Sequence, residues 1–578
     1  MDGSGGSTQR SFDTIDCVVF VGMLAISVII GVYQAYKSRN NEDAVREYLV
    51  GGQNMSIFPI TIYISGITIL GLPAEMYVYG TQYWCVVIAD LFVSLTMTMV
   101  YLPVFYGLGI TSSYEYLKLR FNGAVRLMGS VMFVIKMLLY IPLVIYVPAV
   151  AFNQVTGINL HAIAVLVCVG GLRAVVWTDA IQMIVMFGGV IAIAIIGTNH
   201  VGGFEQQFTC LYRTTAPSFY FSYRPIDSMD FDPTTRHTFW TVVVGNYFNW
   251  LASCSVNQSM VQRFVSILFT RGPIIVSLSC YTGIVIFAAF YDCDPIQTKR
   301  IKKSDQLLPF FVMEMTESIP GLPGLFVAGV FSAALSTMST GLNSMSGVIY
   351  EDMIKPWLRR SLSEVAASRV MKLTVLLMGI GGSTRAALLF VASTRGSIAF
   401  SFRCQAGKSL SGITAGPLLG VFTLGMFFPL ANSAGALVGG FVSLNLIAWI
   451  SFGTQAPAAS IDSRVLPISR EPPFFLYRMS YLWYTWLGCV TAILVGLLVS
   501  WITGPNKRTP GDEKLYTPVI RGLLRDSVAI AAKRQQVRSG RGSRSRYTSF
   551  SPYFQEGVVT ELEKMDGSCR ATTARSSN

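Results

Sequence analysis

Long apolar stretches recur from one end of the chain to the other, with short polar segments between them. A helix needs about 20 apolar residues to cross the hydrocarbon core of a bilayer. This pattern predicts about thirteen membrane spans, of which the fifth is too short to cross alone. The expected spans are 15–36, 54–78, 82–110, 124–152, 159–170, 174–198, 236–262, 272–291, 321–347, 369–398, 409–430, 433–452 and 481–503.

The composition agrees with this pattern. Only 13% of the 578 residues are charged and 52% are hydrophobic, whereas soluble proteins carry about 25% charged residues. We therefore expect an all-α, polytopic membrane protein rather than a soluble enzyme with one anchor. A polar segment with a single basic residue, Arg10, precedes the first apolar stretch. This favours a retained first span over a cleaved signal peptide.

The distribution of charge predicts the orientation. Basic residues follow the first, third and ninth spans, which favours an extracellular N-terminus at residues 1–14 and a transmembrane domain over 15–503. The basic cluster at 299–303 opposes this orientation. Most of the net charge of +13 lies in residues 504–578, expected to be a disordered cytoplasmic tail. Such a tail is typical of contact with anionic lipid or a cytoplasmic scaffold, and we expect no nucleic-acid partner.

Polar side chains inside the spans are densest in the ninth. Between Val330 and Asp352 an apolar run of helical length carries eight Ser, Thr and Asn residues. Inside hydrocarbon such groups must find partners. One interpretation is close packing between helices through small residues. The other is a set of oxygen ligands for a small dehydrated cation, centred on the adjacent hydroxyls of Ser336 and Thr337.

Two spans have features of interrupted helices. The second contains Gly66, Gly71 and Pro73, and the seventh is unusually polar over 245–258. Interrupted helices in corresponding positions of two halves are typical of transporters built from inverted repeats, here about 54–198 and 236–430. Two ordinary kinks are the alternative. No Arg or Lys lies in the core of either span to act as a fixed countercharge for an anion.

Several strings resemble those of the sodium:solute symporter family. They are GGLRAVVWTDAIQ (170–182), VNQSMVQRF (256–264), YDCDP (291–295), DQLLPFFV (305–312), PGLPGLFVAGVFSAALSTMSTGLNS (320–344) and SGITAGPLLGVFTLGMFFP (411–429). The string LGLPAE (70–75) and the YDCDP string resemble the branch that carries monocarboxylates, vitamins and iodide. The resemblance implies two inverted five-helix repeats, formed by spans two to six and seven to eleven.

The resemblance also implies site residues. A sodium ion would bind between the second and ninth spans, at the carbonyls of Thr61, Ile64 and Ala333 and the hydroxyls of Ser336 and Thr337. The solute pocket would include Thr68, Ser253 and Cys254. Asp179, Gln182 and Gln258 would serve coupling or the inner gate, although Asp179 could instead pair with Arg173. Sodium is the only metal implied, as a transported ligand, and no cofactor or catalytic residue is implied.

The function expected from this resemblance is sodium-coupled symport of small organic anions across the plasma membrane by alternating access. Candidate solutes are monocarboxylates, vitamins such as biotin or pantothenate, and iodide. No Walker loop or catalytic triad indicates an enzyme. A symporter of sugars, polyols or choline is one alternative. A non-transporting sensor or an inactive splice form is another, because 160–175 and 262–282 are short for their spans and 380–410 carries four basic residues.

Overall fold

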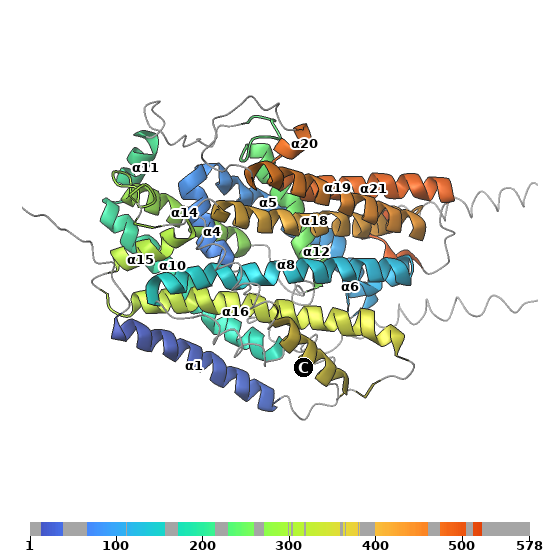
Figure 1. Cartoon of the computed structure of the whole chain (residues 1–578), viewed down its shortest axis with the longest axis horizontal. Helices are drawn as coiled ribbons and strands as arrows, with labels where there is room; N and C mark the ends of the chain where they lie inside the picture. Colours follow the sequence, from blue (N-terminus) through green and yellow to red (C-terminus); the bar gives the residue numbers. More distant parts are fainter. Residues whose placement is uncertain are drawn as a thin grey trace, which may run out of the picture. The chain divides into compact units, whose positions relative to one another are not determined.

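The computed structural model describes residues 13–37, 66–110, 112–156, 172–213, 229–258, 271–298, 300–301, 304–316, 319–358, 362–363, 366–379, 381, 399–459, 474–504 and 512–522. Every regular element among these residues is helical (Figure 1). The first-half helices are α1 (Thr14–Lys37), α4 (Gly66–Tyr79), α5 (Val86–Thr96), α6 (Leu102–Leu108), α7 (Glu115–Arg120), α8 (Gly123–Thr156), α10 (Leu172–Val201) and α11 (Phe204–Arg213). The later helices are α12 (Asn246–Ser255), α14 (Arg271–Ala289), α15 (Leu307–Met315), α16 (Leu322–Val348), α18 (Ala399–Phe427), α19 (Ser433–Ala459), α20 (Phe475–Arg478) and α21 (Tyr484–Thr503).

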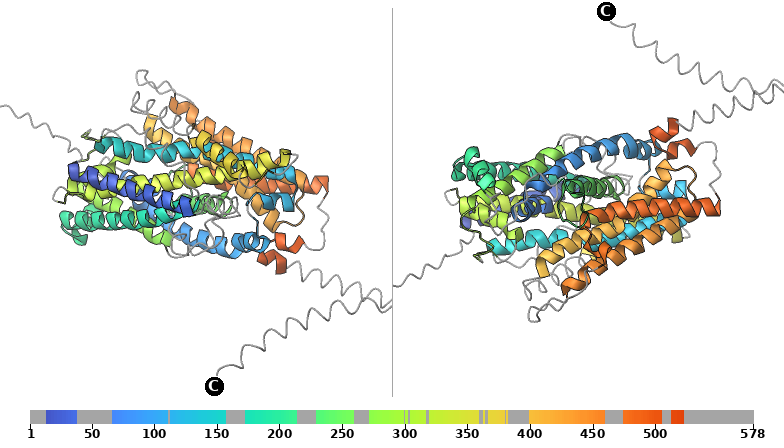
Figure 2. Two further views of the ribbon diagram at one scale, coloured as in Figure 1. Left: turned by 90° about the horizontal axis from the view of Figure 1, so that it is seen from below. Right: turned by 90° about the horizontal axis from the view of Figure 1, so that it is seen from above.

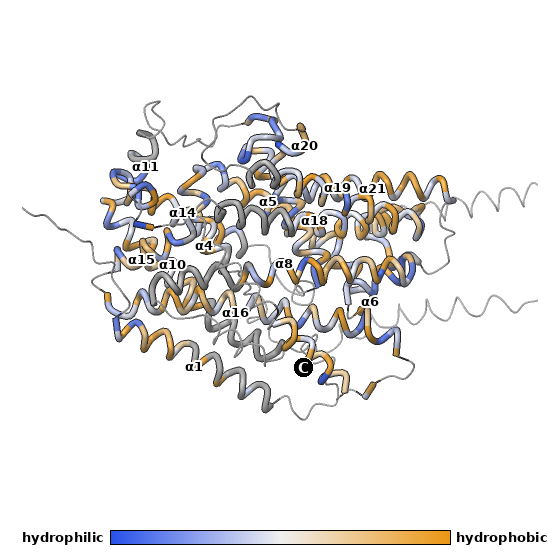
Figure 3. Tube along the Cα trace, in the orientation of Figure 1, coloured by the Kyte–Doolittle hydropathy of each residue, from blue (hydrophilic) through white to orange (hydrophobic). Residues whose placement is uncertain are grey.

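Several of these helices can cross a membrane. Within the described residues, six helical stretches are long and apolar enough: Thr81–Leu108, Gly123–Pro142, Ile184–Val201, Leu322–Trp357, Ser433–Thr454 and Tyr481–Thr503. Three shorter apolar stretches, Thr14–Met23, Pro273–Ala289 and Ser411–Phe427, coincide with further expected spans. Large apolar side chains are exposed along α1, α19 and α21. Figure 3 shows that hydrophobic residues recur along these helices. The all-helical, multi-pass class is therefore confirmed, while the expected fifth span lies outside the described residues.

Helix α16 is the central element of this bundle. In the most apolar part of this helical stretch 89% of the residues are buried, whereas the share is 33–50% in the other five long stretches. It packs against α1, α4, α8 and α10, and the long helices share one general direction (Figures 1 and 2). Gly329 brings its backbone close to α10, because a Cβ there would lie 3.2 Å from the Cα of Met186. Small residues thus allow close helix packing.

The N-terminus of α16 is capped by the first helix. The Asp16 carboxylate accepts hydrogen bonds from the amides of Gly321 (3.0 Å) and Gly324 (3.2 Å). A carboxylate at a helix N-terminus satisfies amides that have no partner within the helix and complements the helix dipole. Gly321 also has φ +90°, a conformation that favours glycine. Helix α1 is therefore joined to the centre of the bundle by its own side chain.

Helices α18, α19 and α21 form a second closely packed group. Gly416 and Gly420 of α18 face backbone atoms of Thr485 and Cys489 in α21, at 2.8 Å from an added Cβ in each case. Gly439 of α19 lies equally close to α21, where an added Cβ would be 2.5 Å from the Ala492 carbonyl. Side chains larger than hydrogen have no room at these positions, so the three helices meet backbone to backbone.

The two expected interruptions have different outcomes. Gly71 and Pro73 lie inside the continuous helix α4, so the chain is not interrupted at these two residues. Gly66 is the first residue of α4, and an interruption of this span before Gly66 stays a prediction, because residues 54–65 lie outside the described part of the chain. Proline is tolerated inside α4 because this helix packs against α14, where Gly283 would place a Cβ 3.0 Å from Pro73. In the seventh span, a π-helical turn at Thr241–Gly245 leads into α12, which ends at Ser255. Val256 and Asn257 are non-helical, so this span is interrupted after α12.

The eleventh helix differs from its expected start. Helix α18 begins at Ala399, ten residues before the expected 409, and contains Arg403 and Lys408. These two charges therefore belong to the first turns of α18 and not to the tenth span. Within this helix, Ser411–Phe427 is an apolar stretch that matches the expected eleventh span. Residues 366–379 are helical, and 382–398 lie outside the described residues.

Candidate ion and solute site

The polar residues of the ninth span lie on α16 in a buried setting. Ser332, Ser336, Thr337, Thr340 and Asn343 are all buried. The Thr337 hydroxyl donates to the Ala333 carbonyl (3.0 Å), and the Thr340 hydroxyl donates to the Ser336 carbonyl (2.9 Å). The Thr337 hydroxyl thus uses its proton within the helix, and its oxygen can still accept or coordinate. The arrangement therefore stabilises the helix and still offers oxygen to a cation.

The expected partner of this row, the second span, is adjacent to it. Helix α4 packs against α16, and Leu70 of α4 shares one buried cluster with Ala333 of α16. Thr68 lies in the first turn of α4 and is half-buried. Thr61 and Ile64 precede α4 and lie outside the described residues. The structure thus brings α4 and α16 together, and it describes three of the five expected sodium ligands.

The other expected pocket residues lie at the end of α12. Ser253 is half-buried and Cys254 is buried in a cluster that also contains Met137 of α8 and Leu342 of α16. The Ser255 hydroxyl donates to the Leu251 carbonyl (2.6 Å), and the helix stops at the next residue. A helix that ends inside the protein presents its last carbonyls, with their partial negative charge, to whatever lies beyond. Helix α8 packs against α4 and α16, which hold the expected sodium ligands, and its Met137 clusters with Cys254 of the expected solute pocket. Helix α8 is therefore next to both parts of the expected site.

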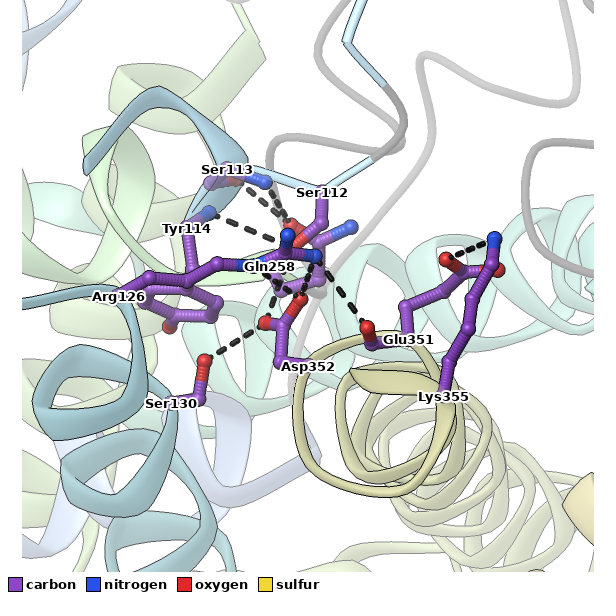
Figure 4. Close-up of polar contacts among 9 residues, drawn as sticks. All are labelled: Ser112, Ser113, Tyr114, Arg126, Ser130, Gln258, Glu351, Asp352 and Lys355. Carbon is purple, nitrogen blue, oxygen red and sulfur yellow. Dashed lines mark hydrogen bonds and ion pairs between the residues drawn. The ribbon is translucent and has the colours of Figure 1, made fainter. Parts of the chain in front are cut away.

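Gln258 follows the interruption and is held by the loop before α7. Its side-chain oxygen accepts hydrogen bonds from the Ser113 amide (2.6 Å) and hydroxyl (2.7 Å) (Figure 4). The neighbouring Tyr114 hydroxyl donates to the Val256 carbonyl at 3.2 Å. The backbone freed by the interruption is therefore satisfied by side chains from another part of the chain. Asp179 and Gln182 lie on α10, and their side chains are not among the described atoms.

An ion pair that the sequence does not predict lies beside Gln258. Arg126 of α8 donates through Nε (2.8 Å) and through Nη2 to Oδ1 of Asp352, which lies in the π-helical turn after α16. Oδ2 accepts from the hydroxyls of Ser130 (2.6 Å) and Ser112 (3.3 Å). The Asp352 side chain is fully buried and that of Arg126 is 13% exposed. We call Arg126, Asp352, Ser130 and Ser112 the Arg126 cluster (Figure 4).

A second ion pair lies at the other end of the seventh span. Nη2 of Arg236, just before that span's helix, donates to Oε1 of Glu75 in α4 at 2.8 Å. The guanidinium lies over the ring of Tyr79, 4.0 Å from its centroid, and 5.3 Å from that of Tyr481. The Tyr481 hydroxyl also donates to Glu75 (3.5 Å). We call Arg236, Glu75, Tyr79 and Tyr481 the Arg236 cluster; it is more open, with Arg236 28% exposed.

Comparison with known proteins agrees with this architecture. The family description "Sodium:solute symporter family" matches residues 48–443. The sodium-coupled monocarboxylate transporter 2 of Mus musculus is 38% identical, covering 88% of this chain and 87% of that protein. For the sodium-coupled monocarboxylate transporter 1 of Homo sapiens the identity is 35% (88% and 91% covered). For the sodium-dependent multivitamin transporter of Oryctolagus cuniculus it is also 35% (89% and 86% covered).

A solved structure shares the fold. The substrate-bound, outward-open state of a Na⁺-coupled sialic acid symporter matches with a TM-score of 0.68 and 25% identity, covering 86% of this chain and 100% of that chain. Together with a family match over more than half of the residues, this defines the class as sodium-coupled solute symporters. The chain belongs to the sodium:solute symporter family. It is a multi-pass membrane transporter and not an enzyme.

Proposed function

We propose that this protein couples the entry of sodium to the uptake of small monocarboxylate anions across the plasma membrane. The main support is the buried hydroxyl row of α16 packed directly against α4. The names of the relatives support the solute class, since they include transporters of monocarboxylates and vitamins. The LGLPAE string, whose Glu75 joins the Arg236 cluster, agrees with that branch.

In the proposed mechanism sodium binds first. The hydroxyls of Ser336 and Thr337 and the carbonyl of Ala333 supply oxygens from α16, and the carbonyls of Thr61 and Ile64 supply the rest from the chain before α4. A hard cation prefers oxygen ligands, and a cage of neutral oxygens can release the ion again on the other side. Because these ligands come from two elements, the ion would tie them together and thereby order the adjoining solute pocket near Thr68, Ser253 and Cys254.

The two ion-pair clusters would act as gates in alternating access. With the N-terminus outside, the Arg236 cluster is the outer gate and the Arg126 cluster is the inner gate, together with Asp179, Gln182 and Gln258. Each ion pair joins the expected first repeat to the expected second repeat: α4 to the segment before α12, and α8 to the end of α16. Relative movement of the repeats would open one cluster while the other stays closed.

Uptake of radiolabelled lactate by cells that express the chain tests this proposal. We expect accumulation in sodium medium and background uptake when N-methylglucamine replaces sodium. Competition by pyruvate, but not by glucose or choline, would distinguish monocarboxylate transport from the alternatives. Equal uptake with and without sodium, for lactate, biotin and pantothenate alike, would contradict it.

The sodium site has its own test. The double substitution Ser336→Ala and Thr337→Ala removes both hydroxyls, and we expect the sodium concentration for half-maximal uptake to rise at least tenfold. That change corresponds to about 1.4 kcal/mol of binding free energy. Thr374→Ala is the matched control, because this threonine also donates to the carbonyl four residues earlier (3.0 Å) but belongs to another helix, 366–379, and is not an expected sodium ligand. An unchanged sodium dependence in the double variant would exclude this site.

A further inference from the structure

A lysine lies inside the membrane-spanning part of α8. Lys136 comes 13 residues after the start of that helix at Gly123, a rise of about 20 Å. Lys136 lies within Gly123–Pro142, the stretch of α8 that is long and apolar enough to cross a membrane. The residue is only 6% exposed. A buried charge at this depth is costly and indicates a function.

Lys136 has no fixed countercharge within the described part of the chain. No hydrogen bond or ion pair of 4.0 Å or less joins it to another described residue. The next residue of α8, Met137, shares a buried cluster with Cys254, the expected solute-pocket residue near the end of α12. Cys254 is also an ionisable group that interacts electrostatically with Lys136. Lys136 therefore lies close to the solute pocket expected from the sequence, on a helix that was not expected to contribute to it.

The end of α12 explains how an ammonium group is retained here. Cys254 is the second-last residue of α12 and clusters with Met137, the neighbour of Lys136, so the end of α12 faces this part of α8. The last carbonyls of a helix carry partial negative charge, and such a helix end stabilises a nearby cation, more strongly where it is buried. This partial charge favours the protonated lysine without neutralising it, and it leaves the ammonium group able to bind a full negative charge.

We infer that Lys136 is the countercharge that binds the carboxylate of the transported solute, an inference that rests on the proposed function and names the residue that selects a monoanion. The carboxylate of a monoanion neutralises the charge of Lys136 when the solute binds. An opposite charge offsets the cost of keeping an ammonium group in a medium of low dielectric. A neutral sugar would leave one positive charge unbalanced there.

Purified full-length protein and expressing cells together test this inference. Lys136→Gln keeps the length and polarity of the side chain but removes the charge, and we expect the KM for lactate to rise at least tenfold. Lys136→Arg keeps the charge, and its KM should stay within about threefold of the native value. Lys372→Gln is the control, since Lys372 is exposed on the helix 366–379 and its loss should change nothing.

Two readouts separate this inference from the proposed function. Stabilisation of the purified protein against heat by lactate, compared with neutral lactamide, measures solute binding without transport. We expect native protein to be stabilised by lactate only, and Lys136→Gln by neither, while stabilisation by sodium remains in both. Lactate binding that depends on Lys136 in a protein without sodium-driven uptake would support the inference and refute the proposed function. Unchanged lactate binding and KM in Lys136→Gln, equal binding of lactamide, or preferred binding of the zwitterion alanine would each overturn the inference.

Discussion

The Arg126 cluster and the Arg236 cluster are built on opposite principles. In the first, a fully buried carboxylate is saturated by a guanidinium and two hydroxyls. In the second, a partly exposed guanidinium is held by one carboxylate and two aromatic rings. Hydrogen bonds to a buried charge depend strongly on geometry, whereas attraction to a ring face varies gradually with position. The first cluster is therefore suited to open in one step, and the second to loosen by degrees.

The largest expected effect comes from removing the acid of each cluster in turn. Asp352→Asn leaves Arg126 buried without a countercharge, a change that costs about 3–5 kcal/mol in buried ion pairs. Glu75→Gln should destabilise the protein less, because Arg236 keeps its aromatic contacts and reaches solvent. Thermal unfolding of both purified variants measures the difference. The pair of Glu351 and Lys355, whose lysine is 53% exposed, provides the control Glu351→Gln. An equal loss of stability in the two variants would remove the distinction between the clusters.

A smaller effect is expected from a hydroxyl of the Arg126 cluster. Ser130→Ala removes the shortest hydroxyl contact to Asp352, at 2.6 Å, in a position closed to water. Hydrogen bonds to charged groups contribute about 1.5–3 kcal/mol. We expect Ser130→Ala to lower the denaturation midpoint and to increase the reactivity of a cysteine placed at Ser113, because the gate opens more often. If that cysteine stays as protected as in the native background, the cluster does not control access.

The aromatic half of the Arg236 cluster is expected to matter less. Tyr79→Leu removes the ring 4.0 Å from the guanidinium but keeps an apolar side chain of useful size. Cation–π contacts contribute about 0.5–2 kcal/mol. We expect a moderate decrease in the rate of lactate uptake, with Tyr79→Phe close to native. A Phe variant as impaired as the Leu variant would assign the effect to the hydroxyl instead of the ring face.

The smallest expected effect concerns pH near the Arg236 cluster. Hydrogen bonds from the Thr234 amide and hydroxyl lower the pKa of the half-buried Asp232, in the loop that leads to Arg236. A lowered pKa means that the ionised form stabilises this turn above the ordinary value of about 3.9 and that the contribution is lost as pH falls through the folded value. Tryptophan fluorescence, which includes the nearby Trp240, should therefore be constant from pH 8 to 5 and change only below about pH 4. Asp232→Asn should abolish that change.

The sequence predicted where the helices lie better than how they join. Apolar length located most spans, and the density of hydroxyls identified α16, because both signals are local. Pro73 was misleading, since a proline in a helix is tolerated or disruptive according to the neighbouring helix, here α14. The two ion pairs could not be foreseen: Arg126 and Asp352 are 226 positions apart, and Arg236 and Glu75 are 161 apart. Lys136 did leave a local signal, as a lone charge in an apolar span.

The cap that Asp16 places on α16 has a consequence for biosynthesis. The acid leaves the ribosome before the amides that it satisfies, the first of which follows 305 positions later. At about 5–20 residues per second, roughly 15–60 seconds pass before the two ends can meet. During that interval α1 lies in the bilayer without its contact to α16. The newly made chain is thus most accessible to quality control before its ninth span is synthesised. Removal of Asp16 by shortening at the N-terminus would leave the amides at the start of α16 without this cap.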